Sequence, residues 1–173
     1  MESRVEFITA NVYALNKLDL GKFDYVLFLG LIYHLRHPYL AIDRIYDVMN
    51  INSELVVESH IIDKGFVNKD KDWVELKDFN PELPQLALAQ IYTNGNLGND
   101  PTNAWAPTLV GLRVMLENSG FSVFRDLNIG FRGVCNARKI QLEHDHPRYM
   151  DTSSEFQIYT SSNPMVILKG GEI

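Results

Sequence analysis

An α/β fold with a mainly parallel sheet covered by helices is predicted by three observations. Strand-like and helix-like segments alternate along the 173 residues. The segment FDYVLFL at 23–29 is apolar without interruption, which is typical of a central strand buried on both faces of a sheet. The length suits a single domain, which buries roughly 70% of its unfolded surface.

The composition excludes several classes of protein. Cys135 is the only cysteine, so an internal disulfide and a thiolate zinc cluster are both excluded, which fits a reducing cytoplasm. The apolar stretch 26–35 is much shorter than the roughly 20 residues that span a bilayer, and the first residues lack a signal-peptide pattern. The formal charge of -6 opposes a general affinity for nucleic acid. A local basic patch remains possible within this acidic chain, formed by Arg125, Arg132, Arg138 and Lys139.

The first half of the chain is predicted to contain three strands and one helix. RVEFITA at 4–10 is a short strand, and 23–29 is the next. After Pro38, apolar residues recur at helical spacing and predict a helix that the polar segment NINS closes at 50–53. ELVVESHII at 54–62 is then the third strand.

The second half begins with a long segment at 63–105 that is rich in charge, proline and turn residues. Such a connection inside a single domain is typical of a lid or a substrate loop. A helix follows at 107–121, with proline in its first turn. Two strands joined by a tight turn at 130–133 predict an antiparallel hairpin. The remainder, 141–173, is a C-terminal extension of the single domain at 1–173.

The order of these pieces resembles the second half of a class I S-adenosylmethionine-dependent methyltransferase. The resemblance covers about residues 4–140 and rests on a strand followed by YHL, a long loop with NAWAPT, a helix ending in SGF, and a hairpin ending in RGVCNARK. Within the superfamily, the chain is most similar to the branch that carboxymethylates the wobble uridine of tRNA. The resemblance implies a Rossmann-like methyltransferase sheet, mostly parallel, with a C-terminal antiparallel hairpin.

The resemblance also implies roles for single residues. Asn11, with Val12 beside it, holds the position that reads the adenine of S-adenosylmethionine or a modified form of it. Residues 29–31, Leu29, Gly30 and Leu31, lie beside the methionine part of this cofactor. Tyr33 and His34 face the acceptor, and His34 is the candidate base, which can contribute about 100- to 10,000-fold in rate. The structural alternatives are a turn-forming role for Asn11 and a strand-capping role for His34.

Five residues are candidates for binding the acceptor: Glu58, Tyr92, Asn103, Trp105 and Arg132. Glu58 shares one face of its strand with His60, and a solvated or mutually bonded pair is the favoured alternative for both residues. Asn103 and Trp105 can orient and stack on a planar substrate, while packing of the indole on the following helix is the alternative. Arg132 could hold a phosphate or carboxylate, or pair with an acid. HDH at 144–146 lacks a third ligand at fixed spacing, so no metal is expected.

The sequence departs from the family pattern before Asn11, where neither the glycine-rich turn nor the first two strands are found. We therefore expect a truncated methyltransferase domain in which residues 4–10 pair directly beside 23–29, with a homodimer contact nearby. The main hypothesis is a cytoplasmic methyltransferase that acts on a small-molecule acceptor in preference to tRNA, with no membrane contact. The alternative is a catalytically inactive binding or assembly module.

Overall fold

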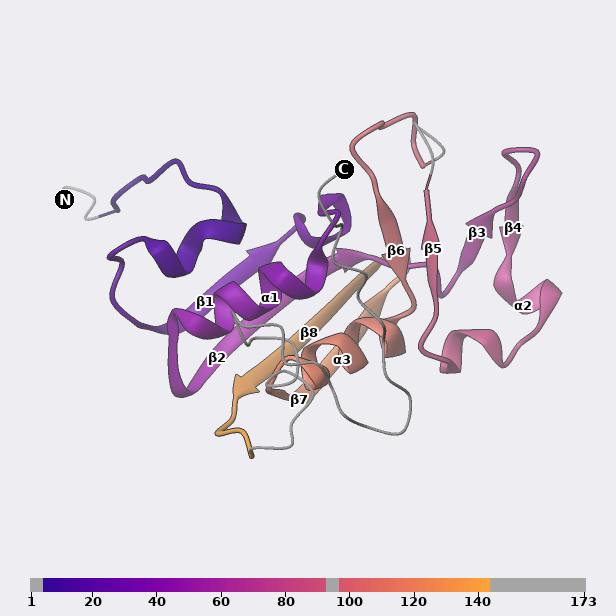
Figure 1. Ribbon diagram of the computed structural model, residues 1–173. Helices are drawn as coiled ribbons and strands as arrows, with labels where there is room; N and C mark the ends of the chain where they lie inside the picture. The colour runs from indigo at the N-terminus through magenta and orange to yellow at the C-terminus, as the bar shows by residue number, and fades with distance from the viewer. Residues whose placement is uncertain (1–4, 93–96, 144–173) are drawn as a thin grey trace, which may run out of the picture.

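Four strands in the order β1-β2-β8-β7 form the main sheet of the computed structural model, which describes residues 5–92 and 97–143 (Figure 1). β1 (Phe23–Leu29) is parallel to β2 (Met49–His60), whereas β8 (Arg132–Lys139) is antiparallel to both β2 and β7 (Phe121–Ile129). The described sheet is therefore mixed, with β1, β2 and β7 running in one direction and β8 against them. The β1-to-β2 connection and the β2-to-β7 connection each cross over through a helix, while the tight hairpin after β7 makes β8 antiparallel to its neighbours.

The antiparallel hairpin predicted around 130–133 is confirmed by β7 and β8. Its turn contains Gly130 at a φ of 71°, a left-handed conformation that glycine adopts without steric cost. The pairing continues from Ile129 opposite Arg132 to Phe121 opposite Lys139, with one irregularity between Val123 and Arg125. The hairpin brings the start of β8 to the same edge of the sheet as the carboxyl ends of β1 and β2.

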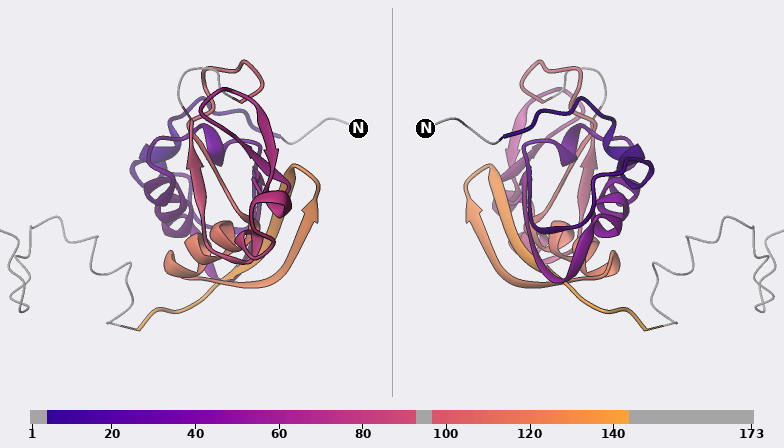
Figure 2. Two further views of the ribbon diagram at one scale, coloured as in Figure 1. Left: turned by 90° about the vertical axis from the view of Figure 1, so that its right-hand side faces the viewer. Right: turned by 90° about the vertical axis from the view of Figure 1, so that its left-hand side faces the viewer.

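Two helices, α1 (Pro38–Asp47) and α3 (Leu109–Asn118), cover one face of the sheet (Figures 1 and 2). Their apolar sides join inward-facing residues of the strands in one core, whose fully buried members include Ile42, Leu55, Val57, Leu112, Leu116, Cys135 and Ala137. Burial raises the pKa of the Cys135 thiol to about 12, so this thiol is not ionised at neutral pH. The predicted helices are thus present, and they hold the sheet from one side only.

The boundaries of both helices differ from the predicted ones. The segment at 50–53, expected to close the first helix, belongs to β2, because Ser53 and the residues after it are paired or packed within the sheet. α3 begins after Thr108, which caps it by accepting a hydrogen bond from Gly111 N–H, and Pro107 is the last residue of the short strand β6 (Trp105–Pro107). A capping threonine marks the helix start more strongly than a preceding proline.

Two predictions for this end of the sheet are wrong: the strand at 4–10 paired beside 23–29, and the central position of the strand at 23–29. Residues 5–10 form no strand, and their side chains are exposed; Phe7 is 93% exposed. β1 is consequently an edge strand of the described sheet, with Tyr25, Leu27 and Leu29 exposed on the face opposite the helices. A strand-forming sequence produces a strand only where a neighbouring strand supplies hydrogen bonds, and no described strand lies beside this edge.

The predicted lid segment contains small elements of its own. β3 (Gly65–Val67) pairs with β4 (Trp73–Glu75), and α2 (Leu76–Phe79) and the 3-10 helix η3 (Leu83–Gln85) follow. β5 (Ala89–Ile91) then pairs with β6. Two further 3-10 helices flank β1: η1 (Val12–Lys17) and η2 (Ile32–His34). The end of the segment at 63–105 is attached at the carboxyl edge of the main sheet, where Ala104 N–H bonds to Tyr33 O at 3.0 Å.

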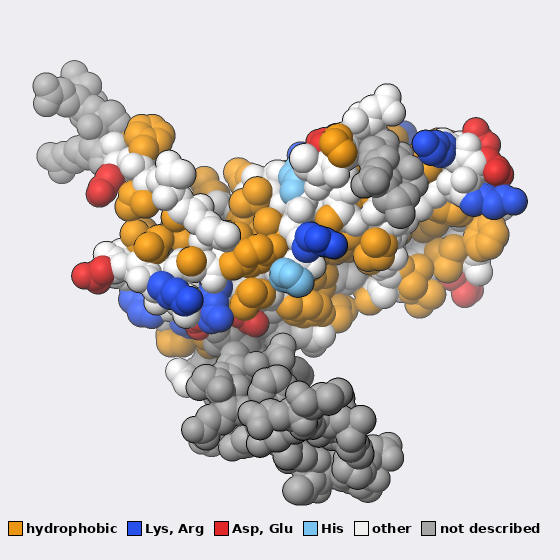
Figure 3. Space-filling view, turned by 45° about the horizontal axis from the view of Figure 1, so that its top comes forward, with side chains coloured by type: hydrophobic (Ala, Val, Ile, Leu, Met, Phe, Trp, Pro, Cys, Tyr) orange, Lys and Arg blue, Asp and Glu red, His pale blue; other side chains and the backbone are white. Residues whose placement is uncertain are grey.

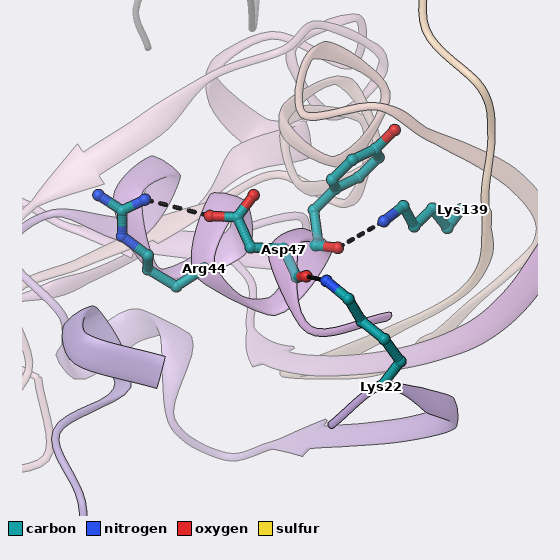
Figure 4. A network of polar contacts seen from close by, with 5 residues as sticks. Lys22, Arg44, Asp47 and Lys139 are labelled. Atoms are coloured by element: carbon teal, nitrogen blue, oxygen red, sulfur yellow. Dashed lines mark hydrogen bonds and ion pairs between the residues drawn. The ribbon is translucent and has the colours of Figure 1, made fainter. Parts of the chain in front are cut away.

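A polar network closes the carboxyl end of α1 (Figure 4). The buried Lys139 ammonium donates hydrogen bonds of 2.8 Å to the carbonyl oxygens of Tyr46 and Met49. Lys22 donates to the carbonyl oxygen of Asp47, whose carboxylate pairs with Arg44 at 3.1 Å. These cations satisfy carbonyl groups at the helix end and complement the negative end of its dipole.

No helix in the described ranges has the length and apolar character to cross a membrane. In the same ranges, no group of three or more His, Cys, Asp or Glu side chains is arranged to hold a metal ion. The HDH segment at 144–146 lies outside the described residues.

Candidate functional site

The candidate site lies at the carboxyl edge of the main sheet, where parallel β1 and β2 end together. After β1 the chain passes through Gly30 at a φ of 68° and enters η2, which carries Tyr33 and His34. Gly30 N–H bonds to Glu58 O at 3.2 Å, so the turn is held against β2. This short turn places two polar rings directly beyond the strand end, where open α/β sheets bind ligands.

The hairpin of β5 and β6 is docked onto η2 by two hydrogen bonds. Ala104 N–H donates to Tyr33 O at 3.0 Å, and the indole N–H of Trp105 donates to Leu35 O at 3.0 Å. The Trp105 side chain is 5% exposed and belongs to the core. Trp105 is therefore mainly a packing residue, which is the alternative considered for it. Part of its side chain also borders the cavity described next.

A cavity of about 710 Å³ opens between η2 and the residues 91–92 and 101–105, within the range of volumes that accommodate small molecules. Its lining side chains include His34, Arg36, Tyr92, Thr102, Asn103 and Trp105. The structure thus brings together four residues predicted from the sequence, which come from η2, from β6 and from the loop around them.

Two polar atoms at this cavity have unused hydrogen-bonding capacity within the described part of the chain. Asn103 donates from its amide nitrogen to Leu97 O at 3.0 Å, and its buried Oδ1 has no partner there. The buried hydroxyl of Tyr92 also lacks a partner in that part, and burial raises its pKa to about 12. Both groups are neutral at physiological pH, the amide because it does not ionise and the phenol because of its raised pKa.

His34 is held by a chain of two hydrogen bonds. Its Nδ1 lies 2.9 Å from the hydroxyl of Thr102, and this hydroxyl donates to Asp100 Oδ1 at 2.6 Å. The Tyr33 ring lies against the imidazole, with ring centres 4.2 Å apart. Hydrogen bonds from Thr102 hold the pKa of the Asp100 carboxyl below its usual value, so this group is a carboxylate at neutral pH.

A second polar group adjoins the cavity through Tyr33. Arg132 Nη1 donates to the Tyr33 hydroxyl at 3.0 Å, and the same guanidinium forms an ion pair with Glu58. Partial burial alone would lower the pKa of Arg132, but the Tyr33 hydroxyl and the Glu58 carboxylate outweigh it and raise that pKa. Tyr33, Glu58 and Arg132 are thus brought together, as an internally paired group beside the cavity rather than in its wall.

His60 lies at the end of β2, next to the same group. Its imidazole is stacked on Phe131 with an interplanar angle of 6°, and its ring centre is 6.2 Å from that of Tyr33. Burial, followed by the positive charge of Arg132, lowers the pKa of His60 to about 4. This histidine is therefore neutral at pH 7. The structure shows no hydrogen bond between the described residues His60 and Glu58, so the two do not form the mutually bonded pair that was considered as an alternative.

The residues predicted on the cofactor side lie near the same edge. The Asn11 side chain caps η1 by accepting a 2.9 Å hydrogen bond from Tyr13 N–H, and the Tyr13 hydroxyl accepts one from His37 N–H just beyond η2. Val12 packs against the core. Leu29 and Leu31 are 52% and 42% exposed on either side of Gly30. Asn11 thus has the turn-forming role that was considered as its alternative. Its amide nitrogen can still donate a hydrogen bond.

The basic residues near the hairpin do not form a free patch. Arg132 and Arg138 are paired with Glu58 and Glu54, and Lys139 is buried. Arg125 is exposed on β7. Figure 3 shows hydrophobic side chains spread widely over the face it presents, interrupted by few basic ones. A phosphate backbone needs several accessible cations, and the described surface does not gather them here.

Sequence reasoning missed Asp100, Thr102 and Arg36. Asp100 and Thr102 flank a proline in NDPTN, and Thr102 N–H bonds to Asp100 Oδ1 at 2.8 Å, which is a local turn that its composition signals. Their contact with His34 spans 68 residues of sequence. The turn could therefore have been predicted, but its partner could not.

No protein-family profile matches the sequence, and no curated protein is similar to it. Solved structures do match. An O-methyltransferase family protein from Burkholderia thailandensis is 16% identical, with a TM-score of 0.53 over 81% of this chain and 37% of its own. Human N-acetylserotonin methyltransferase in complex with SAM is 18% identical, with a TM-score of 0.53 over 82% and 35%. The mitomycin 7-O-methyltransferase MmcR is 15% identical, with a TM-score of 0.50 over 78% and 34%.

The chain spans about a third of the length of these structures, from 34% to 37%. All three are named as methyltransferases, and none of their names mentions tRNA, so the similarity does not extend to the wobble-uridine branch. At these identities the likeness concerns the fold. The described part of this chain therefore has the Rossmann-like fold of part of a class I methyltransferase.

Proposed function

We propose that this chain is the acceptor side of an S-adenosylmethionine-dependent methyltransferase that modifies a small molecule. The observation that carries the proposal is the position of His34, which follows the carboxyl end of β1 and lines a cavity of about 710 Å³. The methyltransferase names of the structures with this fold support the reaction class. A cavity of this size suits an acceptor with one or two rings.

The residues around Gly30 fit part of the cofactor. The exposed leucines 29 and 31 offer apolar contact beside a strand end, and the Asn11 amide nitrogen offers a donor for a purine nitrogen. When bound, S-adenosylmethionine, or a modified form of it, supplies a transferable group on a positively charged sulfur. The remaining contacts to the adenosine part of the cofactor would come from protein outside the described residues.

His34 would act as the base, with Tyr33 packed against it to fix its ring. His34 would take the proton of the acceptor hydroxyl while the acceptor oxygen takes the methyl group that the bound cofactor would supply, and the cofactor would leave as a neutral thioether. The positive charge thus moves from sulfur to the imidazolium, and atoms and charge balance. Holding the partners in line contributes on the order of 7–11 kcal/mol, so positioning matters more than proton transfer.

The acceptor-side residues would have different tasks. Asn103 Oδ1 and the Tyr92 hydroxyl would hydrogen-bond the acceptor, and Trp105 would form an apolar wall. Glu58 and Arg132 would hold Tyr33 in place, because they are already paired with each other. The segment 63–105 would act as the lid. A small molecule is proposed over tRNA because the arginines near the hairpin are paired rather than free.

The test begins with calorimetric titration of the chain with S-adenosylmethionine and S-adenosylhomocysteine, with Asn11→Ala as the matched variant. We expect micromolar binding that the substitution weakens. Incubation with methyl-labelled cofactor and a panel of phenols and nitrogen heterocycles, with unfractionated tRNA in parallel, then identifies the acceptor class. His34→Gln should retain cofactor binding and reduce transfer by about 100- to 10,000-fold. Absence of binding at millimolar cofactor, or label found only on tRNA, would overturn the proposal.

The second candidate is a binding or assembly module without activity, and the exposed face of β1 favours it. Tyr25, Leu27 and Leu29 present an apolar row on an edge strand, which suits a second copy of the chain or another sheet. Light scattering distinguishes these outcomes: a homodimer that Leu27→Asp dissociates would support assembly through this face. A monomer that binds cofactor would contradict it.

A further inference from the structure

We propose that Thr102 and Asp100 are positioning residues that fix the proton of neutral His34 on Nδ1 and leave Nε2 as the basic nitrogen. The inference deepens the proposed function, on which its catalytic meaning rests. The observation behind it is the continuous chain of hydrogen bonds from Asp100 through the Thr102 hydroxyl to the imidazole.

The direction of each hydrogen bond follows from the number of protons present. A threonine hydroxyl has one proton, and an ionised carboxylate only accepts hydrogen bonds. Thr102 must therefore donate its proton to Asp100 Oδ1, 2.6 Å away. Its oxygen then has only lone pairs to offer to His34 Nδ1, 2.9 Å away. The hydrogen bond to Nδ1 exists only if Nδ1 carries the imidazole proton.

The ionised state of Asp100 is also supported by its surroundings. The same oxygen accepts the Thr102 backbone N–H at 2.8 Å, so two donors converge on it. Accepted hydrogen bonds favour the ionised form of a carboxyl group over the neutral one. Two converging donors therefore hold Asp100 as an acceptor, which sets the direction of the whole chain.

The consequence for chemistry is a base with a defined orientation. With the proton on Nδ1, the lone pair of the neutral ring is on Nε2, and Nε2 makes no hydrogen bond to another described residue. When Nε2 takes up a proton, the positive ring faces the Thr102 oxygen, whose negative character is increased by its bond to Asp100. The relay thus selects the tautomer before the reaction and stabilises the cation that forms.

The tautomer can be measured without any substrate. Long-range proton–nitrogen NMR of the chain labelled with ¹⁵N-histidine, at a pH where His34 is neutral, shows which ring nitrogen carries the proton. His34→Gln identifies the signals of this ring among those of the five histidines. We expect the Nδ1-protonated tautomer in the natural chain. A ring protonated on Nε2 would overturn the inference.

The threonine variants show whether the relay is the cause. Thr102→Val keeps the shape and removes the hydroxyl, so we expect His34 to change to the Nε2-protonated form, whereas Thr102→Ser should retain the original tautomer. Thr102 is exposed, so the variants should fold. Thr9→Val, at another exposed threonine, is the matched control and should change nothing. An unchanged tautomer in Thr102→Val would contradict the relay.

Activity measurements distinguish a failure of the relay from a failure of the proposed function. If transfer occurs, Thr102→Val should lower kcat less than His34→Gln does, with the KM for the cofactor unchanged. If the predicted tautomer is found but no acceptor is methylated, the relay stands and the proposed function fails. If transfer occurs with the opposite tautomer, the function stands and the relay fails.

Discussion

Arg132 donates a hydrogen bond of 3.0 Å to the hydroxyl of Tyr33, and this contact joins residues 99 positions apart in the sequence. The guanidinium carbon also lies 5.1 Å from the centre of the Tyr33 ring. The contact fixes the hairpin of β7 and β8 to η2, the element that carries His34. The antiparallel end of the sheet therefore supports the geometry of the candidate site.

A double-mutant cycle with Tyr33→Phe and Arg132→Met should show this coupling. We expect an interaction free energy of about 0.5–1.5 kcal/mol from urea unfolding of the four proteins, because one hydrogen bond is lost only once and the Arg132 side chain is 42% exposed. The exposed pair Arg138 and Glu54 is the control, for which Arg138→Met and Glu54→Gln should give a smaller value. Strictly additive effects of the first pair would contradict the proposed link.

Thr108 should be important for stability, because its buried hydroxyl has three partners. It accepts hydrogen bonds from Gly111 N–H at 3.0 Å and Leu88 N–H at 3.1 Å, and it donates to Leu86 O at 2.6 Å. Thr108→Ala removes the cap of α3 and leaves buried groups without partners, so we expect a loss of about 1–3 kcal/mol in the free energy of unfolding.

Thr108→Ser is the matched variant, since it keeps the hydroxyl and removes only a methyl group. Chemical denaturation of both proteins should place the serine variant much closer to the natural chain. Equal losses for serine and alanine would mean that packing of the methyl group, rather than hydrogen bonding, accounts for the effect.

Lys139 should contribute through the carbonyl groups at the end of α1 (Figure 4). Lys139→Met retains the length of the side chain but leaves Tyr46 O and Met49 O without this donor. We expect a loss of about 1–3 kcal/mol, measured by urea unfolding. Lys69→Met, at an exposed position, is the control and should have little effect. A neutral result for Lys139→Met would show that the burial cost of the ammonium cancels its hydrogen bonds.

The elements with strong local signals were predicted well. The hairpin was recognisable from the glycine turn at 130–133, and α3 from its apolar spacing, because turns and helices depend on residues close in sequence. The segment at 5–10 was expected to be a strand and forms none, since a strand depends on its neighbour. The same reasoning explains why β1 was expected to be central and is an edge strand in the described sheet.

The candidate site was predictable only where it adjoins a strand end. The position of His34 followed from its place after an apolar strand and from the resemblance to a family. Its relay to Thr102 did not, because loops carry no periodic pattern from which a distant contact can be inferred. The pairing of Arg132 with both Tyr33 and Glu58 likewise required the register of β8 against β2.

His60 should make stability depend on pH between about 6.5 and 4. Its pKa is about 4 in the folded chain, mainly because of burial and then because of Arg132, against 6.5 without these influences. In this window the unfolded chain binds more protons than the folded one, so acidification favours unfolding. The contribution is complete above pH 6.5 and is lost as the pH falls through 4.

The lowered pKa is worth about 1–2 kcal/mol after allowance for solvent screening, because the imidazole is only partly buried. His60→Gln should reduce the difference in unfolding free energy between pH 7.5 and pH 4.5 by this amount, as measured by urea titration at both values. Arg132→Met should reduce it less, because burial is the larger cause and remains in that variant. If the glutamine variant keeps the full pH dependence, carboxyl groups rather than His60 are responsible for it.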